Sequence, residues 1–207
     1  MAKEIFPGLA RVGVVWNPAE VNSEINTRLA HDACRHLKIE LLEANAESTA
    51  AVKEAVASLT GRGVEALWIG GDVTVLAAVD VVVRAAKQAR IPVVTCIPGN
   101  AAKGTLLDLG ANYYEVGRET GQLAARALAG ESISQIPVKL SVPPKLLVNQ
   151  TVLAGLRDAW KISPELLAKA DTVIDAQGQH DRAIVASATR SSTSLARRTW
   201  NVQVLGY

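Results

Sequence analysis

Short runs of hydrophobic residues alternate along the chain with segments in which hydrophobic residues recur every three or four positions. The runs are typical of strands buried on both faces, and the recurring positions are typical of helices that pack on a sheet. The expected strands are 9–16, 39–44, 64–69, 91–96 and 106–109, with helices between them. This alternation predicts an α/β fold with a doubly wound parallel sheet in the strand order 2-1-3-4-5.

A further helix is expected over 113–128. Its apolar side chains recur at helical spacing, so we expect Val116, Leu123 and Leu128 to face the core. Gly130 ends this helix, and the pattern then changes. We therefore expect an α/β ligand-binding domain at residues 1–131.

The pattern of the remaining chain predicts short strands and short helices. Two extended runs, 136–142 and 146–149, precede a short amphipathic helix over 152–160. We assign residues 132–175 to crossing strands and short helices, and residues 176–207 to a linker and a terminal strand. A chain that ends on a strand is expected to be part of a longer sequence.

Three of the strands end in polar loops that open directly into helical segments. The loops are 17–20, 70–74 and 97–100. Because parallel strands point the same way, these loops should gather on one edge of the sheet, where ligands of such folds bind. The loops therefore predict a binding surface.

Composition narrows the functional classes. The 207 residues are 49% hydrophobic and carry a net charge of +2 with scattered basic residues, which does not indicate a nucleic-acid surface. No apolar run reaches the ~18–20 residues that cross a bilayer, and the first residues lack the hydrophobic core of a signal peptide. Cys34 and Cys96 have no metal-ligand spacing, and we expect two buried thiols.

Catalytic and cofactor motifs are missing from the sequence. It has no nucleophile elbow, zinc-protease helix, P-loop or dinucleotide fingerprint, and its three histidines have no evident partners. A response-regulator receiver would need an acidic pair where Asn17 and Pro18 stand, and Asp72 alone makes no phosphorylation site. We expect neither an enzyme, nor a metal site, nor a cofactor.

Several segments resemble one protein family, the ABC-transporter substrate-binding proteins that include tryptophan- and tyrosine-binding lipoproteins. The resemblance covers roughly residues 4–175 and is strongest at 109–121. It is carried by 11–23, 71–75, 89–93, 109–121, 136–138, 147–149 and 162–167. It implies one lobe of a type I periplasmic-binding protein, whose sheet has the flavodoxin-like order.

The resemblance also implies partners. A small solute would bind between this second lobe and a missing first lobe, and the complex would dock on the membrane permease of an ABC transporter. The parent protein would be periplasmic or extracytoplasmic. Residues 198–207 resemble the opening strand of a first lobe. A lobe without its partner would expose apolar surface near 136–142 and 146–148, which predicts self-association into a homo-oligomer.

The resemblance also implies ligand-binding residues, at the positions of this sequence that match the ligand loops of the family. The candidate ligand-binding residues are Asn17, Asn22, Ser23, Asp72, Thr74, Gly99 and Asn100. Two positions depart from the family pattern: Val73 stands where Asn is common, and Ile97 stands where an acidic residue would pair with a ligand ammonium. Asp72 could still supply that charge.

Each candidate also has a structural interpretation. Asn17 and Asp72 could cap helices, and Asn100 could be a turn residue. The backbone amides of Ser23 and Thr74, near helix N-termini, could instead hold a ligand carboxylate. Trp16 could stack on an aromatic ligand.

Three functional hypotheses stay open. The first is the solute-binding lobe of an importer that closes around an amino-acid-like solute. The second is a sensory or regulatory module within a larger signalling protein. The third, an enzyme domain of similar architecture, lacks any nucleophile, base or cofactor motif.

Overall fold

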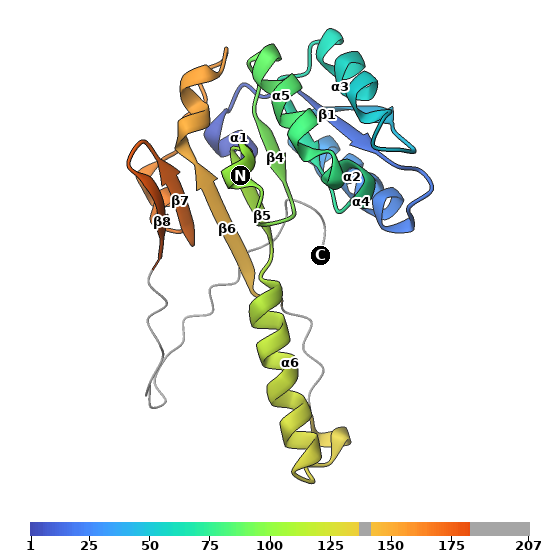
Figure 1. The fold of residues 1–207 in the computed structure, drawn as a ribbon, viewed down its shortest axis with the longest axis vertical. Helices are drawn as coiled ribbons and strands as arrows, with labels where there is room; N and C mark the ends of the chain where they lie inside the picture. Colours follow the sequence, from blue (N-terminus) through green and yellow to red (C-terminus); the bar gives the residue numbers. More distant parts are fainter. Residues whose placement is uncertain (137–141, 183–207) are drawn as a thin grey trace.

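The computed structural model describes residues 1–136 and 142–182 and contains a single mixed sheet of eight strands (Figure 1). The strand order is β2-β1-β3-β4-β5-β6-β7-β8. The first five strands in this order are all parallel to one another, as the sequence predicts. Their bounds are β1 Arg11–Trp16, β2 Glu40–Asn45, β3 Ala66–Ile69, β4 Val93–Thr95 and β5 Leu107–Ala111.

The other three strands extend the sheet beyond β5. They are β6 Pro144–Asn149, β7 Thr172–Asp175 and β8 Gly178–Asp181. Strand β6 is antiparallel to β5 and parallel to β7, and β8 is antiparallel to β7. The sequence assigned residues 176–181 to a linker, but β8 continues the sheet there.

Helices cover both faces of the sheet, and each face has its own hydrophobic core. Helices α3 (Val52–Gly61) and α5 (Val79–Ala89) pack over one core, in which Val56, Leu59 and Val82 are buried. The other core joins α1 (Ala2–Ile5), α2 (Val21–Leu37) and α7 (Pro164–Leu167) to the opposite face. Burial on both faces explains why the central strands are almost wholly apolar.

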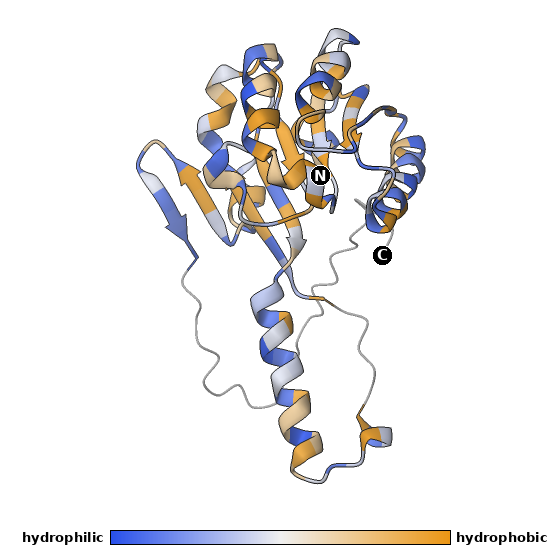
Figure 2. Cartoon of the chain, turned by 45° about the vertical axis from the view of Figure 1, so that its right-hand side comes forward, coloured by the Kyte–Doolittle hydropathy of each residue, from blue (hydrophilic) through white to orange (hydrophobic). Residues whose placement is uncertain are grey.

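Helix α6 (Tyr113–Leu128) has the expected bounds but not the expected packing. It extends away from the sheet (Figure 1), and none of its residues is buried. The prediction that Val116, Leu123 and Leu128 face the core is therefore wrong, and Leu128 is 89% exposed. Figure 2 shows hydrophobic residues, in orange, at intervals along this helix.

Three further expectations need correction. The segment 152–160 does not form a helix, since only a 3₁₀ helix, η3 (Gln150–Gly155), lies there. Residues 146–148 are buried within β6, so they expose no apolar surface. The expected helix after β3 is broken into α4 (Val73–Ala77) and α5 at Ala78.

The remaining short helices are η1 (Ala101–Lys103) and η2 (Ile133–Gln135). The strand expected at 136–142 lies largely outside the described residues, as does the terminal strand near 200–207.

Candidate functional site

The three polar loops lie together at the carboxyl-terminal edge of the parallel strands. Strands β1, β3 and β4 are adjacent in the sheet, so the loops that follow them are neighbours. We call them loop 1 (residues 17–20), loop 2 (70–74) and loop 3 (97–100). This is the edge at which open α/β sheets bind ligands.

Asp72 ties loop 1 to loop 2. Its side chain is buried, and Oδ2 accepts hydrogen bonds from the Asn17 amide and the Ser23 hydroxyl, both at 2.6 Å. Its Oδ1 accepts from the Val75 amide at 2.7 Å, which caps α4. The carboxylate oxygens therefore face inward, and Asp72 organises the two loops rather than pointing into solvent.

Glu20 adds a second link between the same loops. Its carboxylate accepts from the amides of Val73 at 2.8 Å and Thr74 at 3.0 Å, and from the Thr74 hydroxyl at 2.6 Å. Partial burial raises the pKa of Glu20, but hydrogen bonds from Thr74, Val73 and Asn17 outweigh it, so the pKa lies below its ordinary value. The Thr74 amide expected to hold a ligand carboxylate is thus already bonded.

Asn17 and Ser23 are buried, whereas Asn22 is exposed. Asn17 is buried, and its Nδ2 donates to the Thr74 hydroxyl at 3.0 Å, while its Oδ1 accepts from the Ala19 amide. It does not cap α2, whose N-cap is Glu20. Asn22 and Ser23 lie in the first turn of α2, and the exposed Asn22 donates to the Gly71 carbonyl at 2.6 Å.

Asp108 organises loop 3. Its buried carboxylate accepts from the amides of Gly99 at 3.0 Å, Asn100 at 2.6 Å and Ala101 at 2.7 Å, and from the Thr105 hydroxyl. Burial raises the pKa of Asp108, although these hydrogen bonds lower it in part. An acidic residue within the apolar run 106–109 was the sequence signal for this role, and the sequence analysis missed it.

Loop 3 itself is a turn. Gly99 has a φ of 107°, a conformation that glycine adopts readily, and it is exposed. Asn100 is buried, and its Nδ2 donates to the Ile97 carbonyl at 2.9 Å. Asn100 therefore acts as a turn residue, which leaves Gly99 as the exposed candidate of this loop.

The edge also presents apolar side chains to solvent. Val73 is 68% exposed, Val21 is 71% exposed and Ile25 is 39% exposed. Trp16 is partly covered, and its indole Nε1 is buried with no hydrogen-bond partner among the described residues. The surface is thus a polar framework with its bonds turned inward and an apolar outer layer.

The edge carries no reactive group of an evident kind. Burial raises the pKa of Cys34 and Cys96 to about 11, so both are protonated thiols at neutral pH. Within residues 1–136 and 142–182, no cluster of three or more His, Cys, Asp or Glu side chains could hold a metal ion. In the same residues, no helix is long and apolar enough to cross a bilayer.

Comparison with known proteins identifies the class. A family described as ABC transporter substrate binding protein matches residues 1–174, which is most of the chain. The chain therefore belongs to the ABC transporter substrate-binding protein family. This confirms the resemblance, and the observed fold confirms the predicted α/β architecture of a periplasmic-binding-protein lobe.

Individual relatives are similar over about half of their own length. A tyrosine-binding protein from Clostridioides difficile is 28% identical over 165 residues, or 80% of this chain and 47% of that protein. A conserved domain protein from Vibrio cholerae superposes with a TM-score of 0.70 at 29% identity, over 83% of this chain and 57% of that one.

An ABC domain in complex with L-Trp, from a Streptococcus, gives the same TM-score and coverage at 20% identity, which supports the fold alone. The chain thus spans about half the length of the relatives it matches.

Proposed function

We propose that this chain is the solute-binding lobe of an ABC importer's substrate-binding protein, and that it binds a small, amino-acid-like solute by closing against a second lobe. The observation that carries the proposal is the edge formed by loops 1, 2 and 3. The buried carboxylate of Asp72 joins loops 1 and 2, and the buried carboxylate of Asp108 fixes the turn of loop 3. A wall that is organised before the ligand arrives loses less entropy on binding.

Helix α6 supports the proposal of a partner lobe. It begins at Tyr113, two residues after β5 ends, and therefore leaves the sheet at the same edge as the candidate loops. One side of it carries the partly covered Val116, Leu123 and Ala127. A helix with an apolar face is stable when that face is buried. A partner lobe that faces loops 1, 2 and 3 would bury the apolar face of α6.

The exposed apolar side chains at this edge indicate the chemical class of the solute. Exposed Val73 and Val21 would contact an apolar side chain of the ligand, whereas the inward polar bonds leave few donors for a sugar. A relative is a tyrosine-binding protein. We infer a solute with a hydrophobic or aromatic side chain.

The same proposal assigns the chain a binding role without catalysis, with the permease of the transporter as its membrane partner. The parent protein would work outside the cytoplasm, as the family description implies. Its action would be hinge closure of two lobes, which presents a closed complex to the permease.

Calorimetry on the isolated chain and on the full-length parent tests the proposal. We expect L-tyrosine or a similar amino acid to bind the parent, and to bind the isolated chain weakly or not at all, because half the cleft is absent. Asp72→Ala in the parent should weaken binding at least tenfold, since loops 1 and 2 lose their shared acceptor. Glu54→Ala, which alters an exposed residue of α3, is the matched control.

Two results would contradict this. Micromolar binding by the isolated chain would remove the need for a second lobe, and an unchanged dissociation constant in Asp72→Ala would separate loops 1 and 2 from the site.

Ile97 provides a gain-of-function test. The family often has an acidic residue at this position, and Ile97 lies in loop 3, only partly covered. Ile97→Asp in the parent should tighten binding of a ligand ammonium, whereas the isosteric, uncharged Ile97→Asn should not. Equal effects of the two variants would argue against an ammonium group near loop 3.

A further inference from the structure

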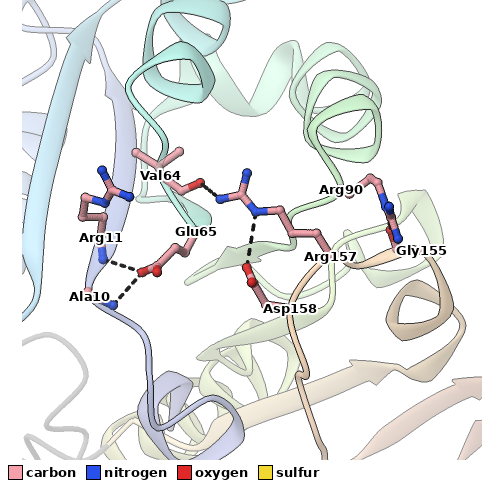
Figure 3. Close-up of polar contacts among 8 residues, drawn as sticks. All are labelled: Ala10, Arg11, Val64, Glu65, Arg90, Gly155, Arg157 and Asp158. Atoms are coloured by element: carbon pink, nitrogen blue, oxygen red, sulfur yellow. Dashed lines mark hydrogen bonds and ion pairs between the residues drawn. The ribbon is translucent and has the colours of Figure 1, made fainter.

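A segment that we call the strap, residues 150–160, crosses the edge of the sheet opposite the candidate loops. The Arg157 amide donates to the Arg90 carbonyl at 2.8 Å, and Arg157 Nη2 donates to the Val64 carbonyl at 2.8 Å. Arg90 Nε donates to the Gly155 carbonyl at 3.4 Å (Figure 3). These bonds fix the strap against the end of α5, and a cavity of about 280 Å³ lies between α5, η1 and the strap.

The walls of this cavity are apolar, and its charged groups are all positive. Three cations line it: Lys87, Arg90 and Lys103. None of the lining residues is acidic. The side chains of Lys87 and Lys103 are exposed and form no hydrogen bond or ion pair within the described residues. The apolar lining comes from Val83, Ala86, Ile91, Val93, Val152 and Leu156.

The neutral polar side chains of the cavity already have partners. Asn149 Nδ2 donates to the Ala101 carbonyl at 2.7 Å, and its Oδ1 accepts from the Thr151 amide and hydroxyl. The ammonium groups of Lys87 and Lys103 and the two Nη groups of Arg90 are therefore the polar groups of the cavity that are left for a ligand.

Stabilisation of α5 does not explain all three cations. Positive side chains near a helix C-terminus interact favourably with its dipole, which accounts for Lys87 in the last turn and Arg90 at the C-cap. Lys103 belongs to η1, a different element, and reaches the cavity from another wall. All three cations are exposed to solvent, and together they would attract an anion to the cavity.

We propose that this cavity is a second ligand site, which binds a small organic phosphate. Three cations suit a dianion better than a monoanion, and the apolar walls suit an attached hydrocarbon or ring. The site lies at the opposite edge of the sheet from loops 1, 2 and 3, so it is independent of the proposed solute site.

An NMR titration of the 207-residue chain with phenyl phosphate tests the proposal. The amides of Gly104 and Gly155, which line the cavity, should shift saturably, while those of Gly71 and Gly99 at the other edge should not. Inorganic phosphate should bind about tenfold more weakly because it buries no apolar surface. Benzoate, a monoanion with the same ring, should also bind several-fold more weakly.

Lys103→Met should weaken phenyl phosphate binding at least fivefold, because it removes the cation and keeps the apolar stem. Lys53→Met, at an exposed site on α3, should leave the affinity unchanged. The proposal is overturned if Gly104 and Gly155 do not respond to phenyl phosphate, or if both lysine variants weaken it equally. Benzoate binding as tightly as phenyl phosphate would overturn the assignment of a phosphate.

Discussion

At the scale of single residues, the carboxylate of Asp108 accepts more backbone hydrogen bonds than any other side chain of the candidate edge. Asp108→Asn replaces one acceptor oxygen with an amide nitrogen that faces N–H donors. We expect a loss of about 2–3 kcal/mol in the free energy of unfolding, measured by urea denaturation. Glu54→Gln on the exposed face of α3 is the control, and an equal loss in both variants would contradict the role of Asp108.

Gly110 lies where two backbones approach closely. A Cβ at this position would lie 1.8 Å from the Cys96 carbonyl oxygen, so Gly110→Ala requires the main chain between β4 and β5 to move. We expect a loss of at least about 3 kcal/mol. The control is Gly117→Ala on α6, where nothing lies within 4 Å and the change should be neutral or stabilise by about 0.5–1 kcal/mol.

The link made by Glu20 depends on pH. Its pKa is lower in the folded chain than in the unfolded one, so its contribution is present above the unfolded pKa and disappears as pH falls through the folded pKa. At pH 7 we expect Glu20→Gln to lower the stability by about 1 kcal/mol, or the Tm by roughly 2–4 °C. The difference between the thermal melts of the two proteins should shrink as pH falls through the folded pKa of Glu20, and a constant difference would contradict the link.

The residues missed from the sequence share a physical cause. Periodicity shows which side chains are apolar, but not which backbone amides a carboxylate will accept. Asp72 and Asn100 were assigned both a structural and a ligand-binding role, and the structure supports the structural role for each. Glu20 accepts hydrogen bonds from a loop more than 50 residues away, and only the folded chain brings those donors to it. Asp108 accepts from amides seven to nine residues before it, but the turn that aims them at one oxygen is not visible in the periodicity.

At the scale of elements, helix α6 is the part of the described chain with the least tertiary support. Isolated helices of this length are marginal in water, and its 16 residues have no buried member. We expect its amides to exchange with deuterium far faster than those of α5, which packs over a core. In the full-length parent the same amides should become protected, and equal protection in both proteins would show that α6 needs no second lobe.

Elements were predicted well where local sequence decides them. Strands β1, β3 and β4 are continuous apolar runs, and burial on both faces leaves them no alternative. Strand β8 was missed because its four residues are all exposed and polar, so only backbone pairing with β7 defines it. The bounds of α6 were correct, but its periodicity did not show that the helix would extend away from the sheet.

At the scale of the whole molecule, the described chain combines a sheet that is covered on both faces with a helix, α6, that has no buried residue. The strands that the sequence expected to expose apolar surface, near 146–148, are buried within β6. The two most exposed large apolar side chains of the described residues are Leu128 at the end of α6, 89% exposed, and Ile133 just beyond it, 77% exposed. The prediction of self-association therefore moves from the strands to α6.

The assignment of self-association to α6 can be tested. The isolated chain should form concentration-dependent oligomers in analytical ultracentrifugation, because burying these side chains between two copies removes apolar surface from water. Leu123→Lys with Leu128→Lys should give a monomer with an unchanged circular dichroism spectrum, since neither side chain is buried in the core. Lys substitutions that leave the oligomers intact would show that α6 is not the associating surface.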